Sequence, residues 1–290
     1  MDEVGSNCVT KAMQDGSTPS STASLLRSFI GAHLRRIGGW IAVGDLVELI
    51  GHAGVTDNST RSALSRLKGK GLLVSESRGG RPGHRLDDDA VAMLERGDRR
   101  IYGYRQMRAG DDWMLVLFSV PESDRHLRHQ LRSALTWMGS GMVASGTWIA
   151  PGHLLGETRA VLAERGLLGY VTTMVTRDVQ PPTPMRSAVH EWWDLASLRA
   201  RYGDFLQIAD PIADRWLDTA VRRDAESDRT AFVDHLVLVD HWRDIPYLDP
   251  GLPSALMPAD WPGPRAVALF GDLHALLNPA AARHVAAVIG

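Results

Sequence analysis

The sequence predicts an α+β fold in which two mixed segments precede a helical one. Near the N-terminus, helical patterns flank an apolar stretch that reverses through glycines, which indicates a small sheet packed on helices. Over residues 113–176, apolar runs alternate with helical periodicity in the order β-α-β-β-α-β, which is the ferredoxin-like order. After residues 180–184, which three prolines hold extended, the pattern is helical.

The chain of 290 residues is long enough for two or three domains, and we expect three behind a disordered tail. The tail is rich in Ser, Thr, Asp and Gly and has no periodicity. The expected parts are the tail at 1–23, an N-terminal domain at 24–100, a ferredoxin-like domain at 101–179 that mediates dimerisation, and a helical C-terminal domain at 180–290.

The composition is that of an ordinary globular chain, with 44% hydrophobic and 23% charged residues. No apolar run is long enough to cross a bilayer, and the polar N-terminus lacks the apolar core of a signal peptide. The single cysteine, Cys8, cannot form an intrachain disulfide and belongs to no metal-binding spacing. We therefore expect a cytoplasmic protein with no membrane contact and no cofactor.

The N-terminal domain opens with two helices separated by a short strand. Apolar residues recur at three- and four-residue spacing from residue 26 to 37, and Gly38 and Gly39 end this helix. Residues 40–42 are predicted to form a strand that closes the hairpin sheet. A second helix carries the apolar residues of 46–50 and ends near 51–54.

The next helix, from about residue 56, has one apolar and one polar side. Ala63, Leu64 and Leu67 fall on the apolar side of a regular helix. The polar side carries two rows, Arg61, Ser65 and Lys68 in one and Ser62 and Arg66 in the other. Thr56, Asn58 and Ser59 are candidate N-caps, and Gly69 and Gly71 are predicted to stop the helix.

A hairpin with a basic tip follows this helix. The apolar residues 72–74 lead into a turn, and the chain returns at 84–86. The turn is predicted to run through Gly79, Gly80, Pro82 and Gly83, with Arg78, Arg81 and Arg85 at the tip. A basic helix followed by a basic hairpin is what a winged helix-turn-helix needs, because the helix enters the major groove and the hairpin contacts phosphates. A solvated amphipathic helix before an ordinary loop is the alternative interpretation.

The charge distribution favours the DNA-binding interpretation. Residues 24–108 carry 15 basic and 9 acidic side chains, whereas residues 109–290 carry 16 and 22. Within 61–85 there are seven basic residues and one acid, Glu76. Because phosphate binding depends on local positive charge, the overall charge of −2 is a poor guide to partners.

The predicted DNA contacts divide by chemistry. Arg61 and Arg66 are the expected base readers, because a guanidinium bridges guanine O6 and N7. The remaining contacts are expected from Ser59, Thr60, Ser62 and Ser65, to phosphates or base edges, and from Lys68, Arg78, Arg81 and Arg85, to phosphate. For any single arginine, surface solubility is the competing explanation. A homodimer would place two such helices about 34 Å apart on a palindromic operator.

The rest of the chain follows from the same periodicities. A helical segment starts at 90–94, and a basic connector with two tyrosines, Tyr102 and Tyr104, spans 96–108. The elements expected next are strands at 114–120, 142–145, 147–150 and 170–176 and helices at 126–137 and 154–165. In the last part, Trp192, Leu195 and Leu198 are assigned to one helix, and further helices are expected within 205–222 and at 232–242, 266–277 and 280–289, with a proline-rich stretch at 245–264.

Three segments in this order carry a resemblance to a known family. They are TRSALSRLKGKGLL with its Gly/Arg-rich hairpin, then WMLVLFSVPE and LRSALTWMGSGMVASGTWIAP, then LVLVDHWRDIPYLDPGLPSALMPADWPG. On these residues the chain resembles the PaaX family of bacterial transcriptional repressors, over nearly everything after residue 24. The resemblance implies a winged helix, a central domain similar to the small CRISPR-associated nuclease fold, and a helical C-terminal domain.

The resemblance also implies a homodimer that represses an operon for phenylacetate or other aromatic catabolism. Its effector would be an aryl-CoA thioester such as phenylacetyl-CoA, which releases the repressor from DNA. Two departures stand out: acidic residues 87–89 follow Leu86 where the family has a Leu-Thr segment, and Asp244 stands where a second basic residue is frequent. A different effector would explain such departures.

An effector site is placed at the break after the helix of residues 232–242. An aryl group would stack on Trp242 or Tyr247, and Arg243 would pair with a phosphate or carboxylate, with His241 beside them. The alternative is interdomain packing, with Arg243 holding Asp244 or Asp249.

Two other function classes are open to a chain of this kind. A nuclease on the ferredoxin-like domain needs carboxylates around a divalent ion, yet the strand that leads to Pro121 supplies no acid before Glu122. The pair Asp111 and Asp112 precedes that strand, and the histidines give no zinc-ligand spacing. We therefore expect no catalytic residue and no metal site. A DNA-binding scaffold without an effector is the other alternative.

Overall fold

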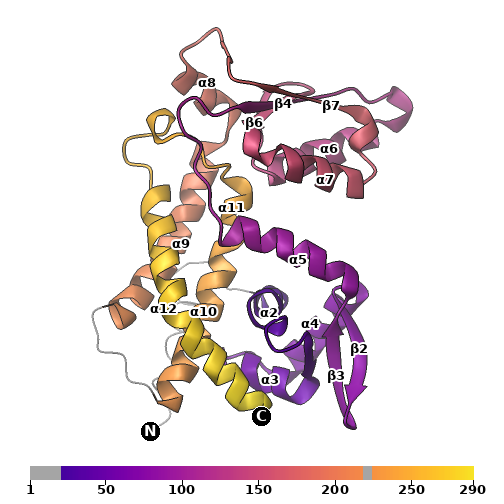
Figure 1. The fold of residues 1–290 in the computed structure, drawn as a ribbon, viewed down its shortest axis with the longest axis vertical. Coiled ribbons are helices and arrows are strands. Elements are labelled where there is room, and N and C mark those ends of the chain that lie inside the picture. The colour runs from indigo at the N-terminus through magenta and orange to yellow at the C-terminus, as the bar shows by residue number, and fades with distance from the viewer. Residues whose placement is uncertain (1–20, 218–223) are drawn as a thin grey trace. The chain divides into compact units, whose positions relative to one another are not determined.

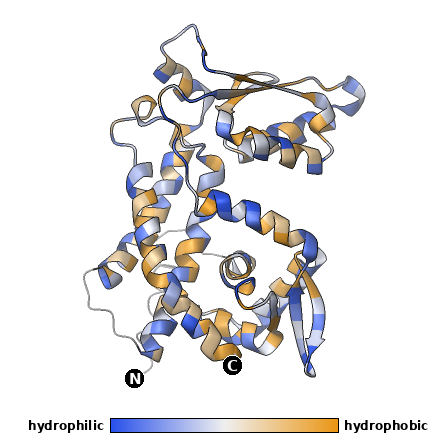
Figure 2. Ribbon diagram, in the orientation of Figure 1, coloured by the Kyte–Doolittle hydropathy of each residue, from blue (hydrophilic) through white to orange (hydrophobic). Residues whose placement is uncertain are grey.

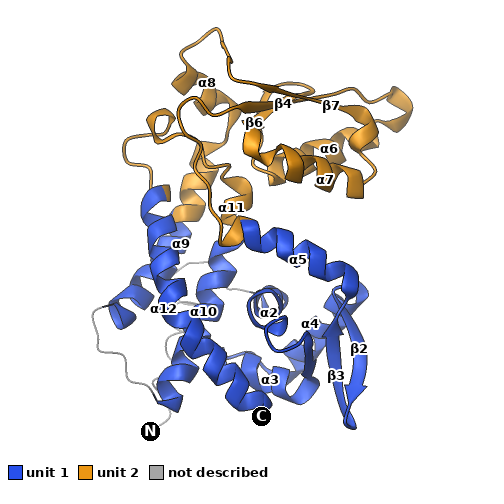
Figure 3. Cartoon of the chain, viewed as in Figure 1, with its two compact units in different colours: residues 1–99, 203–243, 264–290 blue, residues 100–202, 244–263 orange. Residues whose placement is uncertain are grey.

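The structure, a computed structural model, describes residues 21–217 and 224–290. Residues 1–20 of the predicted tail, and residues 218–222 of one predicted helix, lie outside the described residues. The fold is α+β, with two antiparallel sheets and a helical C-terminal region. It divides into two compact units (Figure 3): unit 1 comprises residues 1–99, 203–243 and 264–290, and unit 2 comprises residues 100–202 and 244–263.

The elements are labelled in Figure 1. The α-helices of the described residues are α2 (Thr22–Phe29), α3 (Val43–His52), α4 (Asp57–Gly69), α5 (Asp88–Ile101), α6 (His126–Trp137), α7 (Leu155–Glu164), α8 (Met185–Trp192), α9 (Leu195–Trp216), α10 (Ala225–Trp242), α11 (Ile245–Leu248) and α12 (Gly263–Ile289). The strands are β1 (Trp40–Ala42), β2 (Leu73–Arg78), β3 (Arg81–Leu86), β4 (Trp113–Phe118), β5 (Gly141–Ala144), β6 (Thr147–Pro151) and β7 (Val171–Thr176).

The first helix of unit 1 begins at a side-chain cap and changes from an α-helix to a π-helix along its length. The Ser21 hydroxyl accepts a hydrogen bond from the Ser24 N–H at 3.2 Å, as an N-cap does. After α2 the chain continues as a π-helix, η1 (Ile30–Leu34), which the periodicity does not predict. Gly38 and Gly39 then end the helix at φ of 89° and 73°, as predicted, because glycine tolerates these angles.

The sheet of unit 1 has the order β1-β3-β2. The predicted short strand at 40–42 is present as β1, which pairs with β3. The hairpin turn is only Gly79 and Gly80, at φ of 56° and 77°, and the far end of the hairpin is hydrophilic (Figure 2). Placing Pro82 and Gly83 in the turn was wrong, since both lie in β3. Placing Arg85 at the tip was also wrong, since it pairs with Val74 near the other end of the hairpin.

Gly83 is required in β3 by the tryptophan beside it. A Cβ at this position would lie 2.5 Å from the Trp40 ring and 2.6 Å from the Ile41 carbonyl oxygen. The Trp40 indole N–H donates to the Glu76 carbonyl at 3.0 Å, which ties β1 across β3 to β2. The base of the hairpin is therefore held by packing and by hydrogen bonding, while its tip projects.

One hydrophobic core joins segments from both ends of the chain in unit 1. It contains Phe29 of α2, Leu64 of α4, Phe232 of α10 and Val285 of α12, all almost fully buried. The helices that read as a separate C-terminal domain thus share buried surface with the N-terminal segment. This packing holds α4 from its apolar side.

The second sheet, in unit 2, has the order β5-β6-β4-β7, and each neighbouring pair is antiparallel. Helices α6 and α7 lie on one face (Figure 1), where Met114, Val116 and Trp148 form a core. On strands β4 and β6, Trp113 and Ile149 instead belong to a second cluster with Trp193 and Met257. The chain order β4-α6-β5-β6-α7-β7 is the predicted order of elements.

Several predicted helix boundaries were wrong. Helix α10 begins at Ala225 and not at residue 232, and α9 runs unbroken from Leu195 to Trp216, where two helices were predicted. Helix α5 runs to Ile101, beyond the predicted start of the connector at residue 96. Trp192 ends α8, while Leu195 and Leu198 belong to α9. Helix α12 continues through Pro279, where two helices were predicted. An interior proline costs one hydrogen bond, and the burial of the following turn, around Ala281, offsets that loss.

No helix in residues 21–217 or 224–290 is long and apolar enough to span a membrane.

Candidate nucleic-acid interface

Helix α4 presents a polar face because its other face is part of the core. Ala63, Leu64 and Leu67 are each at most 2% exposed, whereas the predicted contact residues on the opposite face are exposed. Those exposed residues are Ser59, Arg61, Ser62, Ser65, Arg66 and Lys68. The Thr56 hydroxyl caps the helix by accepting from the Ser59 N–H at 3.4 Å. The polar face is therefore held by a capped helix on a packed platform.

Thr60 is a correction to the predicted contact set. It is fully buried, and its hydroxyl donates to the Thr56 carbonyl at 3.2 Å. The position three residues before Ala63 and four before Leu64 brings it onto the apolar side of α4. Thr60 therefore stabilises the helix and has no access to DNA.

The two arginines predicted to read bases have no partner in the part of the chain that the structure describes. Arg61 and Arg66 are exposed, and neither guanidinium makes a hydrogen bond or ion pair there. Lys68, two residues after Arg66, donates to the Ser75 hydroxyl on β2 at 3.4 Å. Helix α4 thus offers two free guanidinium groups on one exposed face.

The hairpin arginines are paired with acids. The Glu76 carboxylate binds both Arg78 and Arg85, the latter at 3.2 Å, and Arg85 also reaches Asp88 at 3.2 Å. Arg81 pairs with Asp45 at the start of α3. The pairs of Arg78 and Arg85 with Glu76 and Asp88 lie at the surface and contribute at most about 1 kcal/mol each, so a phosphate group competes with them readily. Asp45 is instead 8% exposed, so the loss of Arg81 would leave a buried carboxylate without its partner.

One face of the hairpin carries all three arginines. In the β2–β3 register Arg78 lies opposite Arg81, and Glu76 lies opposite Gly83, with Arg85 two residues along. Side chains two residues apart, or directly opposite, point to the same face of a sheet. The Arg78 guanidinium also lies 5.4 Å from the Trp40 ring centroid. The arginines can therefore meet one phosphate backbone together.

The structure does not bring the predicted effector residues together. Trp242 is fully buried, stacked on Phe270 with centroids 4.6 Å apart, and packed on Phe205 at 5.0 Å. It cannot receive an aryl ligand, and this part of the prediction was wrong. A tryptophan at the end of a helix can belong either to a hydrophobic core or to a ligand site. Trp242 belongs to the core.

The other three effector candidates make structural contacts. His241 Nδ1 lies 2.9 Å from the Val237 carbonyl oxygen, and Arg243 donates to the Ser24 hydroxyl at 2.9 Å. Tyr247 stacks on Trp137 with centroids 5.4 Å apart. His241 and Arg243 belong to unit 1 and Tyr247 to unit 2. Asp249, offered as a partner of Arg243, accepts from the Tyr202 hydroxyl and the Gly251 N–H.

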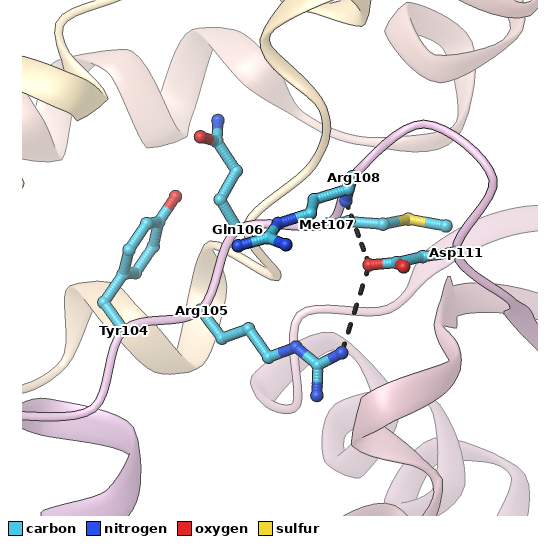
Figure 4. Close-up of a pocket in the computed structure, with 6 residues that line it drawn as sticks. All are labelled: Tyr104, Arg105, Gln106, Met107, Arg108 and Asp111. Carbon is cyan, nitrogen blue, oxygen red and sulfur yellow. Dashed lines mark hydrogen bonds and ion pairs between the residues drawn. The ribbon is translucent and has the colours of Figure 1, made fainter.

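A pocket of about 620 Å³ in unit 2 was missed by the sequence reasoning. It is lined by the segment that connects α5 to β4, namely Tyr104, Arg105, Gln106, Met107, Arg108 and Asp111 (Figure 4). The available signal was the basic connector with its tyrosines. In residues 21–217 and 224–290, no group of three or more His, Cys, Asp or Glu side chains is arranged to hold a metal ion.

Three family models match consecutive parts of the chain. They are described as PaaX-like protein over residues 21–90, PaaX protein central Cas2-like domain over 106–188, and PaaX-like protein C-terminal domain over 193–287.

A curated relative and a solved structure match most of the chain. The curated relative, the transcriptional repressor PaaX of Escherichia coli strain K12, is 29% identical over 268 residues, which cover 91% of this chain and 82% of the relative. The solved structure is that of an uncharacterized protein from Mycobacterium tuberculosis, 24% identical. It covers 93% of this chain and 98% of its own, with a TM-score of 0.55, and shows the fold alone. On the family models and the curated relative together, the chain belongs to the PaaX family.

Proposed function

We propose that the chain is a sequence-specific DNA-binding repressor of a catabolic operon. The observation that carries the proposal is the exposed face of α4, where Arg61 and Arg66 have no partner among the described residues and the opposite face is core. A guanidinium held this way is ready to bridge the two acceptors of a guanine. The name of the Escherichia coli relative supports the same role.

In this proposal α3, α4 and the β2–β3 hairpin act as a winged helix-turn-helix. Helix α4 enters the major groove, and Arg78, Arg81 and Arg85 exchange their carboxylate partners for phosphates beside it. The short turn between α3 and α4 and the sheet order β1-β3-β2 support this arrangement.

The central sheet is proposed to act as a ferredoxin-like dimerisation domain. Its order β5-β6-β4-β7, with two helices on one face, supports that assignment. Two copies related by a two-fold axis would read a palindromic site with half-sites about 34 Å apart.

A small molecule, an aryl-CoA thioester such as phenylacetyl-CoA, is proposed to release the repressor. Release requires that the ligand bind the arrangement without DNA more tightly than the arrangement on DNA. The proposed cycle takes place in the cytoplasm and includes no catalytic step and no cofactor.

The proposal is tested by a gel shift on DNA from upstream of the protein's own gene, with and without phenylacetyl-CoA. We expect a complex that a palindromic fragment competes for and that the thioester dissociates. A complex insensitive to thioesters would favour the scaffold alternative. Cleavage of plasmid DNA in the presence of magnesium or manganese would favour a nuclease instead.

A further inference from the structure

The wall of the pocket in unit 2 is fixed by a second segment, the proline-rich stretch after α11. The Met107 N–H donates to the Gly251 carbonyl at 2.7 Å. The Gln106 side-chain amide donates to the Leu252 carbonyl at 3.2 Å and to the Ser254 hydroxyl at 3.0 Å. These bonds hold the connector between α5 and β4 in an extended course although it has no regular secondary structure.

The contact between the two segments is close enough to require glycine. Gly251 has a φ of 73°, and a Cβ there would lie 2.2 Å from the Arg105 carbonyl oxygen. Next to it, the fully buried Asp249 accepts from the Gly251 N–H at 2.7 Å and from the Tyr202 hydroxyl. The pocket wall is therefore organised before any ligand arrives, which reduces the entropy lost on binding.

The side chains on this wall leave positive charge available. The Arg108 guanidinium has no partner in the part of the chain that the structure describes. Within residues 21–217 and 224–290, the Arg105 guanidinium pairs only with the Asp111 carboxylate, at 4.0 Å, and both arginines are exposed. Asp111 also accepts from the Arg108 N–H at 3.0 Å, so its carboxylate stays within the wall (Figure 4). Two cationic side chains, which point in different directions, thus line the pocket together with one anionic side chain.

A neighbouring histidine responds to the same positive charge. Burial, followed by the charges of Arg105 and Arg100, lowers the pKa of His153 to about 4. Arg100 is itself only 8% exposed and donates to the Met138 carbonyl at 2.8 Å. The positive charge of Arg105 therefore reaches this neighbouring side chain, although burial is the larger cause of the lowered pKa.

We propose that this pocket binds a ligand with phosphate or carboxylate groups, which the separate guanidinium groups of Arg105 and Arg108 hold, and a planar group that lies against Tyr104. Each guanidinium matches the geometry of such an oxyanion, and a tyrosine ring offers a surface for stacking. The volume of about 620 Å³ lies within the usual range for small-molecule sites.

The position of the pocket in the chain gives it a regulatory use. The pocket follows the point between Arg99 and Arg100, the first of four points where the chain passes between the two units. A ligand that immobilises residues 104–111 acts directly after one of these four covalent connections. This use, though not the binding itself, rests on the proposed function.

Calorimetry on the full chain tests the site with four probes: phenylacetyl-CoA, coenzyme A, phenylacetate and pyrophosphate. We expect at least one probe to bind, and Arg105→Ala and Arg108→Ala each to weaken its binding about tenfold or more. Asp111→Asn keeps a hydrogen-bond acceptor for the Arg108 N–H but removes a competing charge, so it should tighten binding. Arg165→Ala, which removes an exposed arginine of unit 2 outside the pocket, is the matched control.

The probes separate the two sources of the oxyanion. Binding of coenzyme A and pyrophosphate assigns a phosphate group, whereas binding of phenylacetate alone assigns a carboxylate; either result supports the site. Failure of all four probes overturns it, as does unchanged binding in both arginine variants. A gel shift on the same proteins is read separately: a chain that binds probes but no operator contradicts the proposed function and leaves the site in place.

Discussion

The polar face of α4 and the β2–β3 hairpin both carry arginines, but the arginines differ in whether an acidic side chain pairs with them. On α4, Arg61 and Arg66 have no acidic partner among the described residues. On the hairpin, Glu76, Asp45 and Asp88 take up the arginines. A free guanidinium on a packed helix can commit its full hydrogen-bonding geometry to a base, whereas a paired one must first exchange its partner. Under the proposed function, we therefore expect α4 to discriminate between sequences and the hairpin to adjust the overall affinity for DNA.

The largest expected effect comes from removing the platform beneath α4. Leu64 is 2% exposed in the core of unit 1, and Leu64→Ala should lower the free energy of unfolding by about 2–5 kcal/mol. Operator binding should then fall through loss of folded protein. Urea unfolding followed by circular dichroism measures the change. Unfolding at the wild-type urea concentration would show that α4 is not held by this core.

A smaller effect, confined to DNA binding, is expected from Arg61→Ala or Arg66→Ala. Each should weaken operator binding by about 1–3 kcal/mol and relax the preference at one base position, with stability unchanged. Footprinting titrations on operator variants measure both quantities. The control is Arg99→Ala, which removes an exposed arginine from α5. If the α4 variants lose no more affinity than this control, α4 does not read bases.

The sequence predicted which residues of α4 are buried and which are exposed. It did not predict that the hairpin arginines are paired with acids while those of α4 are not. The periodicity of α4 placed Ala63, Leu64 and Leu67 inside and Arg61 outside, because a helix of this length has one well-defined apolar face. It could not separate the two sets of arginines, because pairing depends on the register that brings Glu76 beside Arg78 and Arg85. Asp45, the partner of Arg81, lies 36 residues away in the sequence.

The same limit explains the effector residues, whereas the burial of Thr60 follows from the helical spacing of α4 itself. Trp242 is an aromatic residue of the type that ligand sites contain, but the residues packed around it come from α9 and α12. No local sequence pattern shows that these distant helices meet at Trp242. The pocket at 104–111 depends on Gly251 and the segment around it, more than 140 residues along the chain. Local periodicity finds faces of elements; contacts between distant segments need the fold.

Loss of a hairpin arginine should weaken binding to every DNA sequence, and not to the operator alone. Arg81→Ala is expected to weaken binding to all DNA sequences by a similar factor and to reduce the salt slope of log K by about 1, because one phosphate contact is lost. Binding measured over a series of salt concentrations, on operator and on unrelated DNA, gives both values. A loss seen only on the operator would mean that the hairpin reads sequence and would end the division of roles.

The smallest expected effect is a gain in DNA affinity, whereas the other variants lose affinity. Glu76→Gln removes the carboxylate that holds Arg78 and Arg85, and the Trp40 hydrogen bond survives because it uses the Glu76 backbone carbonyl. Since an exposed pair is worth at most about 1 kcal/mol, affinity for any DNA should rise less than tenfold. The gain should shrink as salt screens the freed charges. Glu95→Gln, the same charge change on the exposed surface of α5, is the control. Equal affinities for the two variants would mean that the hairpin arginines reach phosphate without leaving Glu76, and that their pairing does not limit DNA binding.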